Sequence, residues 1–417
     1  MHRSSGGASL LWIDARRRVE DRLVGPVEEP VRYNMRAELA SALANGAFMT
    51  ILAFIPLLLR RLGGSPEVLA LCTASVYLGN VLSPLGLYFV RPGQVKRTVA
   101  FLWLVARAAF LAAGFVTGDI GLLLVVAFFW FFDQLPAPMY SFIIQRVYPA
   151  SERGKVMAVV RVGMGLSTLA LTPVAGWVLD RAGYRTLFPV AAAAGIVAAL
   201  LFLRLRVDES ASTIDRTRIV NYAGRILRRD RRFTLYLVAL AFFGFSSLMP
   251  MPLYPLVQAD RLGLSYLALG WLSLLFTFSR LVTYFYWGRR IDRWGSVRCL
   301  QIAFLLNVVV VSPFIVASQA WMLIPSYLAQ GAVNSALDLG YVTAAIQLAA
   351  PKHIAEYAAL QFVVIGLRGM LGPLIGVSLL RVGLSQTAVF GLSIVMALVA
   401  AAILGGVNRR QPQLRAT

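Results

Sequence analysis

The chain has 417 residues, of which 59% are hydrophobic and only 14% carry a charge. Soluble domains carry a charge on about a quarter of their residues, so this composition excludes an ordinary soluble domain and indicates a membrane protein. Two cysteines and two histidines offer neither a disulfide framework nor a metal site, and we expect no cofactor. No Ser/Cys–His pairing or glycine-rich phosphate loop is evident, so the sequence argues against an enzyme.

The chain opens with a basic segment, residues 1–36, that could lie on the membrane surface as an amphipathic stretch. Apolar runs of about 20 residues, the length that a helix needs to cross a bilayer, follow it along the chain. They lie near 37–59, 66–89, 98–117, 120–144, 156–179, 186–203, 234–257, 264–287, 299–317, 320–348, 357–380 and 387–406. We therefore expect an all-α membrane protein with twelve transmembrane helices.

The longest polar interruption, residues 204–233, divides these spans six and six. Residues 37–203 would form an N-terminal six-helix bundle and residues 234–406 a C-terminal one. Residues 407–417 would form a short tail.

Basic residues alternate from loop to loop. With the N-terminus inside, the inner segments hold 30 Lys and Arg, the outer loops 6 and the spans 4. Lys and Arg concentrate on the cytoplasmic side of membrane proteins. The asymmetry predicts a plasma (inner) membrane protein with both termini in the cytoplasm. It also accounts for the net charge of +21, which in a soluble protein would indicate nucleic-acid binding.

The two halves resemble each other at offsets of 200 to 202 residues. RRLGGS at 60–65 recurs as DRLGLS at 260–265, and TPVAGWVLDRAG at 172–183 recurs as GPLIGVSLLRVG at 372–383. GLYFVRPGQVK at 86–96 recurs as GRRIDRWGSVR at 288–298. Internal repeats of this kind are typical of secondary transporters, whose two bundles rock about a shared central site.

The second copy of that last repeat resembles the loop motif of the major facilitator superfamily, through Gly288, Asp292, Arg293, Gly295 and Arg298. The resemblance implies a gate on the cytoplasmic side. We expect Gly288 to let two helices approach closely. We expect Asp292 to meet a helix N-terminus or an arginine of the neighbouring helix, as a clasp that holds the inside closed. The alternative is a positive-inside anchor with a tight turn.

The repeated Gly-Pro stretch resembles the motif of the family's fifth helix. By this resemblance Pro173, Gly176, Pro373 and Gly376 are helix-packing residues. Val90 stands where the first half would carry the clasp aspartate, and the fourth span lacks the arginine-glycine pattern of drug–proton antiporters. These departures argue against a drug–proton antiporter.

Ionisable residues at membrane depth are costly and often mark functional sites. Asp133 and Asp338 lie midway through the fourth and tenth spans. Arg107, Arg280 and Arg368 lie near the middle of the third, eighth and eleventh spans. We expect Arg107, on a peripheral helix, to serve packing.

Four polar residues of the tenth span lie on one helix face because they recur at i, i+4, i+8 and i+11. They are Gln330, Asn334, Asp338 and Tyr341.

In the fourth span, Asp133 and Tyr140 take the places that Asn334 and Tyr341 hold in the tenth. The family resemblance implies that the first and fourth helices of each half line a central cavity. Asn45 in the first span and Ser246 in the seventh would then face it as well.

Two interpretations of the buried charges remain open. The aspartates could pair with arginines such as Arg280 or Arg368 and lock helices together. Alternatively, a buried carboxylate carries a coupling proton while an arginine orients an anionic substrate.

The sequence thus predicts a monomeric secondary transporter in the lipid bilayer that binds a small-molecule substrate and protons. The substrate would be an amphiphile for efflux or a small organic anion. The alternative is a membrane sensor or scaffold of the same fold.

Overall fold

The structure is a computed structural model that describes residues 20–21, 25–83, 85–86, 93–208, 226–227, 230–349 and 354–409. The described residues form helices and no strand. Nine helical stretches among them are long and apolar enough to cross a membrane, and α4 is a shorter apolar helix. The all-α membrane class predicted from composition is therefore confirmed.

Six spans make up the N-terminal half. They are built from α2 (Glu29–Met49), η1 (Thr50–Phe54), α3 (Ile55–Arg61), α4 (Pro66–Leu82), α5 (Val95–Ala112), α6 (Asp119–Gln134), α7 (Ala137–Val147), α8 (Ala150–Ala182) and α9 (Tyr184–Phe202). The first span begins at Glu29, eight residues before the apolar run at 37–59.

The C-terminal half repeats this arrangement in the described part of the chain. It contains α11 (Arg231–Leu248), η3 (Met251–Leu253), α12 (Tyr254–Leu256), η4 (Val257–Arg261), α13 (Tyr266–Trp294), α14 (Ser296–Val316), η5 (Ala320–Leu323), α15 (Ile324–Leu348), α16 (Ile354–Arg381) and α17 (Gln386–Arg409). Each of the twelve predicted spans thus contains at least one helix within the part of the chain that the structure describes.

Proline explains where spans are interrupted. A proline inside a helix removes a backbone donor and clashes with the preceding turn. The fourth span accordingly breaks between α6 and α7 at Pro136, and the seventh breaks into short helical turns around Pro250 and Pro252. In contrast, α8 and α16 continue through Pro173 and Pro373.

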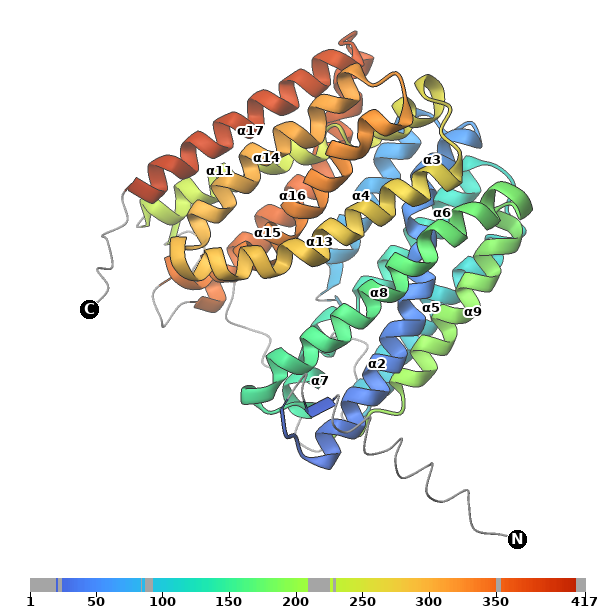
Figure 1. The fold of residues 1–417 in the computed structure, drawn as a ribbon, viewed down its shortest axis with the longest axis vertical. Coiled ribbons are helices and arrows are strands. Elements are labelled where there is room, and N and C mark those ends of the chain that lie inside the picture. Colours follow the sequence, from blue (N-terminus) through green and yellow to red (C-terminus); the bar gives the residue numbers. More distant parts are fainter. Residues whose placement is uncertain are drawn as a thin grey trace.

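The two halves form two bundles that lie side by side, from blue to green and from yellow to red in Figure 1. They pack against each other through α8 with α13 and through α4 with α16. The bundles meet at the end where α3 terminates and α13 begins, here called the closed end. At the opposite end, where α2 begins and α13 terminates, the ribbons of α8 and α13 diverge (Figure 1). We call this the open end.

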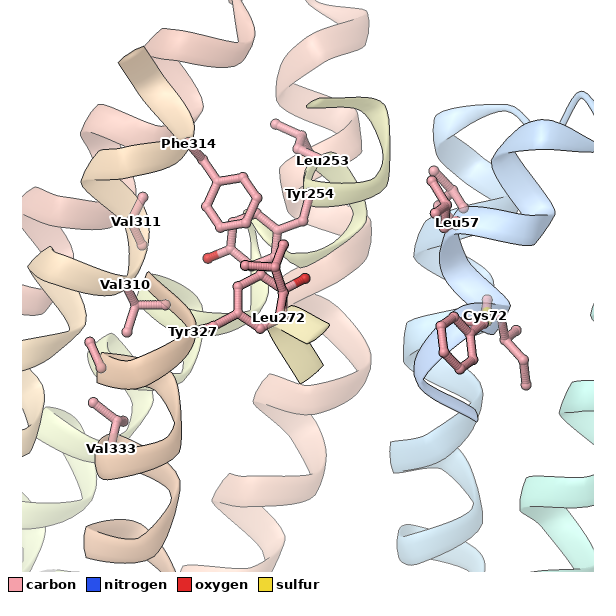
Figure 2. Close-up of a cluster of buried hydrophobic side chains, with 14 of the residues drawn as sticks. Leu57, Cys72, Leu253, Tyr254, Leu272, Val310, Val311, Phe314, Tyr327 and Val333 are labelled. Carbon is pink, nitrogen blue, oxygen red and sulfur yellow. The ribbon is translucent and has the colours of Figure 1, made fainter. Parts of the chain in front are cut away.

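Each bundle has a packed apolar interior. In the C-terminal bundle the Tyr254 ring stacks on Phe314 with their centroids 4.1 Å apart (Figure 2). The Tyr327 hydroxyl beside them accepts a hydrogen bond from Gln258 at 2.8 Å. Buried tyrosines are stable in such a core when the hydroxyl has a partner.

Much of the predicted central loop, 204–233, lies outside the described residues, as do residues 1–19, Val90 and 410–417. The described start of the loop is bound to the N-terminal bundle. Asn34 of α2 exchanges two hydrogen bonds with the backbone of Arg206, at 2.8 and 3.0 Å.

Candidate functional site

The closed end is held together by the two copies of the RRLGGS/DRLGLS repeat. Arg60 of the first copy binds Asp260 of the second through both Nε and Nη2, at 2.7 to 3.0 Å. The neighbouring Arg61 donates to the backbone carbonyl of Leu264. Both contacts join the N-terminal bundle to the C-terminal bundle.

Two further contacts join the bundles at this end. Asp180, at the end of α8, accepts hydrogen bonds from the backbone N–H groups of Tyr266 and Leu267 at 2.9 and 2.7 Å. A carboxylate at a helix N-terminus satisfies free donors and complements the helix dipole. In the equivalent place of the other half, Arg381 at the end of α16 pairs with Glu67 at the start of α4, at 2.7 Å.

The predicted helix-packing motif lies beside these contacts. A Cβ built on Gly176 would lie 2.5 Å from the carbonyl oxygen of Tyr266, so only glycine lets α8 approach α13 this closely. A Cβ on Gly376 would lie 2.1 Å from the carbonyl oxygen of Met249, at the end of α11. The two glycines both permit close packing, but Gly176 packs between the bundles and Gly376 within one.

In the N-terminal bundle, Arg107 of α5 pairs with Asp133 of α6 at 2.9 Å. Its other terminal nitrogen donates to the Asn45 side chain of α2 at 3.0 Å. Arg107 is 97% buried, being 3% exposed. Arg107, which we expected to serve packing, does join α5 to α6 and α2, and it does so by binding the candidate carboxylate of Asp133.

The C-terminal bundle contains a second pair of the same kind. Arg280 of α13 binds Asp338 of α15 at 2.6 Å, and the Tyr284 hydroxyl donates to the same carboxylate oxygen. Pairing of Asp338 with Arg280 was one of the alternatives left open by the sequence. The side chains of this pair are 38% and 44% exposed, against 4% and 9% for Arg107 and Asp133. Only the second pair is accessible.

Arg368 of α16 forms no ion pair with any other described residue. It donates to the Leu240 carbonyl oxygen at 2.5 Å and to the Tyr341 hydroxyl at 2.9 Å, and its Nε has no partner. Its aliphatic stem occupies the space that a side chain at Gly244 would need. The neighbouring Gly369 lies against the ring of Tyr77 on α4, so this charge is buried next to the contact between the bundles.

The polar residues of the tenth span do not form one network. The Asn334 amide donates to the backbone carbonyl of Gln330 within α15, at 2.9 Å. Asp338 turns to α13 and Tyr341 turns to α16. Ser246 is fully buried and accepts from Asn307 of α14, so it faces the interior of its bundle rather than a central cavity. This corrects the expectation for Ser246.

A chamber of about 220 Å³ lies inside the N-terminal bundle, between α2, α5, α7, α8 and α9. Glu38 lies on its wall and accepts hydrogen bonds from the hydroxyls of Tyr140 and Tyr148. Burial, together with the Glu38 carboxylate, raises the pKa of Tyr148, so this phenol remains a donor. Tyr148 follows the last residue of α7.

Sequence reasoning placed Tyr140 and Asn45 among the site residues but did not select Glu38 and Arg161. Both line the chamber together with Arg107. Each is a charged residue close to the predicted end of an apolar run, where a side chain can reach water. A charge near the end of a span is not costly, so the sequence did not mark these two residues as functional candidates.

The predicted gating motif lies at the open end. Gly288 meets open space, because a Cβ built there would have no heavy atom within 4 Å. The expected helix approach at Gly288 is therefore not made in this open-ended conformation. Gly295 instead makes the turn between α13 and α14, with a φ of +80° that side-chain-bearing residues rarely adopt.

The charged residues of the motif face solvent. Asp292, Arg293 and Arg298 are exposed, and Asp292 forms no ion pair with another described residue. The Arg298 guanidinium lies 5.4 Å from the Trp294 ring centroid. The clasp is not formed in this open-ended conformation, and its Val90 counterpart lies outside the described residues.

Comparison with known proteins identifies the family. Residues 38–258 and 237–416 each match the profile of the Major Facilitator Superfamily. No curated protein sequence matches the chain. Among solved structures, a point mutant of the nucleoside transporter NupG is similar with a TM-score of 0.72 and 12% identity, over 91% of this chain and 100% of that one.

Two further structures share the fold. A bacterial homologue of the human lysosomal transporter Spinster, inward-facing and unoccupied, has a TM-score of 0.63 and 16% identity, over 92% of this chain and 98% of that one. A mutant of the peptide transporter POT with alafosfalin has a TM-score of 0.66 and 15% identity, over 91% and 95% of the respective chains. The two matched halves and the two packed bundles agree: this chain belongs to the Major Facilitator Superfamily.

Proposed function

We propose that this protein is a proton-coupled secondary transporter that carries a small organic anion across the plasma membrane by alternating access. The anionic substrate class is inferred from Arg368. Its guanidinium is only 7% exposed and has no carboxylate partner among the described residues. A buried charge is costly unless it is paired. An anionic solute would supply the missing partner.

The difference between the two ends of the molecule supports alternating access. One end is joined by Arg60–Asp260, Asp180 at the α13 N-terminus and Arg381–Glu67, while the bundles diverge at the other (Figure 1). A transporter that opens its ends in turn must break one such set of contacts as the other forms. The conformation described here, closed at one end and open at the other, would be one of the two states of that cycle.

The charge distribution supports an assignment of the ends. The inner segments of the predicted topology hold 30 Lys and Arg against 6 in the outer loops. By the positive-inside rule, the open end faces the cytoplasm and both termini are cytoplasmic. The conformation is then inward-facing.

Proton coupling is proposed for Asp133 and Asp338. Each carboxylate is bound to an arginine, Arg107 or Arg280. Protonation would neutralise the carboxylate and release its arginine, which changes the local charge by one unit. The accessible pair, Arg280–Asp338, is the one that solvent protons can reach from the open end.

Asp292 is proposed to act when the open end closes. It lies exposed at the end of α13, with Arg293 and Arg298 beside it. Closure would bring this end of α13 towards the N-terminal bundle, where a helix N-terminus or an arginine could receive the carboxylate. A scaffold would need neither this free carboxylate nor an unpaired buried arginine, which favours transport over the sensor or scaffold alternative.

The proposal is tested with the purified full chain in lipid nanodiscs. Thermal unfolding is measured against matched sets of organic anions, neutral amides and cations at pH 5.5 and 7.5. We expect anions alone to raise the melting temperature, and Arg368→Gln to lose the effect of at least one of them. Stabilisation by cations only would refute the anion class.

Transport itself is tested with proteoliposomes containing a pH-sensitive dye. Addition of a stabilising anion should move protons with the wild-type chain, and Asp338→Asn should abolish that movement while binding persists. Anion movement at the same rate without proton movement would refute the coupling.

A further inference from the structure

The chamber inside the N-terminal bundle is distinct from the Arg368 position, which lies in the other bundle. All its wall residues come from α2, α5, α7, α8 and α9. Its volume of about 220 Å³ lies below the roughly 300–1,000 Å³ of a typical drug pocket. A small solute would fill it.

Most polar groups on the wall are already used. Ser41 donates to the Ala198 carbonyl oxygen at 2.8 Å, and Asn45 accepts from Arg107 and donates to the Met164 sulfur. The Trp103 N–H donates to the Asp133 carbonyl oxygen at 3.3 Å. These polar groups are already hydrogen-bonded within the protein, so few of their donors and acceptors remain for a ligand.

The single carboxylate on the wall is occupied as well. Both oxygens of Glu38 accept a tyrosine hydroxyl, one from Tyr140 and one from Tyr148 at 2.6 Å. A cationic solute is therefore disfavoured.

The unused groups are guanidinium donors. Arg161 of α8 lines the chamber, is exposed, and makes no hydrogen bond or ion pair with any other described residue. The Nε of Arg107 is buried without a partner in the described part of the chain. A charged guanidinium with free donors can form the paired hydrogen bonds that recognise a carboxylate.

The rest of the wall suits an apolar body. Trp103, Met157, Val160, Met164 and Phe202 face the chamber. Aromatic rings and thioethers make favourable contacts with one another and with flat apolar groups.

From these observations we infer that the chamber is a second ligand site, which binds a small monocarboxylate with its anionic head at Arg161 and its apolar body among the aromatic and thioether side chains. This site stands independently of the proposed transport, because it requires only binding.

Three isosteric probes test the inference: benzoate, benzamide and benzamidine carry charges of −1, 0 and +1 on the same ring. Binding of each to the purified full chain in nanodiscs is measured by calorimetry. We expect benzoate to bind at least about tenfold more tightly than benzamide, since a hydrogen bond to a charged group is worth about one decade or more in affinity. Benzamidine should bind weakest.

Variants assign the binding to the chamber. Arg161→Gln should weaken benzoate binding about tenfold or more, and Arg161→Lys should restore part of it. Ala199→Leu, which fills the chamber from α9, should abolish it. Arg97→Gln removes an exposed positive charge at the start of α5 and should leave it unchanged.

Equal binding of benzoate and benzamide would overturn the inference, and so would undiminished benzoate binding in Arg161→Gln or Ala199→Leu. Because the readout is binding alone, a protein that binds benzoate but moves no anion would refute the proposed transport and retain this site.

Discussion

Arg60 and Asp260 stand 200 positions apart, at equivalent places in the two copies of one repeat, and they bind each other across the contact between the bundles. An internal duplication places equivalent loops at the same end of the molecule. Because one copy carries Arg and the other Asp at the equivalent position, the two loops form an ion pair. The closed end thus depends on a divergence between repeats that are otherwise alike.

Charge exchange at this pair is the first prediction. Arg60→Asp should open the closed end by placing two carboxylates together, whereas the double variant Arg60→Asp/Asp260→Arg should restore closure. The pair is partly exposed, so its contribution is about 0.2–1 kcal/mol and the shift in population about 1.4- to fivefold. Labelling of a cysteine placed at the partly exposed Ser65, with the native buried cysteines replaced by serine, measures this shift.

If the double variant labels as fast as the single one, the pair does not hold this end closed. The same cysteine in an otherwise unchanged chain gives the reference rate.

The cap on α13 gives the second prediction. Asp180→Ala removes the acceptor of two backbone N–H groups, at Tyr266 and Leu267, and should cost about 0.5–2 kcal/mol. Asp180→Asn keeps one acceptor oxygen and should cost less. Chemical unfolding of the two variants in the same detergent compares them. Equal losses would contradict capping as the role of this carboxylate.

The two arginine–aspartate pairs should differ in their effect on stability. Asp133→Asn leaves Arg107 as a buried charge without its carboxylate and should lower the free energy of unfolding by about 3–5 kcal/mol. The double variant Arg107→Gln/Asp133→Asn should recover part of this loss. Asp338→Asn, at the more exposed pair, should cost less than about 1 kcal/mol.

Unfolding of the four proteins in one detergent gives the comparison. A larger loss for Asp338→Asn than for Asp133→Asn would contradict the difference in burial from which the prediction is drawn.

Glycine positions provide the fourth prediction. Gly244→Ala places a Cβ 1.9 Å from the Cδ of Arg368 and should displace that side chain. Gly176→Ala would meet backbone and should destabilise the contact of α8 with α13 by about 1–3 kcal/mol. Gly288→Ala would place its Cβ in open space. Because alanine favours a helix more than glycine does, this change should leave the stability unchanged or raise it slightly. Melting temperatures rank the three.

Greater destabilisation by Gly288→Ala than by Gly176→Ala would contradict the packing described for α8 and α13.

The sequence by itself determined the membrane class, the twelve spans and the twofold repeat. Each of these three features follows from local composition or from similarity along the chain. None of them depends on which helix faces which. Asp133, Asp338 and Arg368 were found because charge at membrane depth is rare.

Only the tertiary structure decided what these residues contact. Arg107, expected to serve packing, reaches Asp133 because α5 and α6 are neighbours, and a helical sequence does not specify the rotation of its neighbour. Ser246 was misplaced for the same reason. The chamber with Glu38 and Arg161 arises from five helices at once, so no single span carries a signal for it.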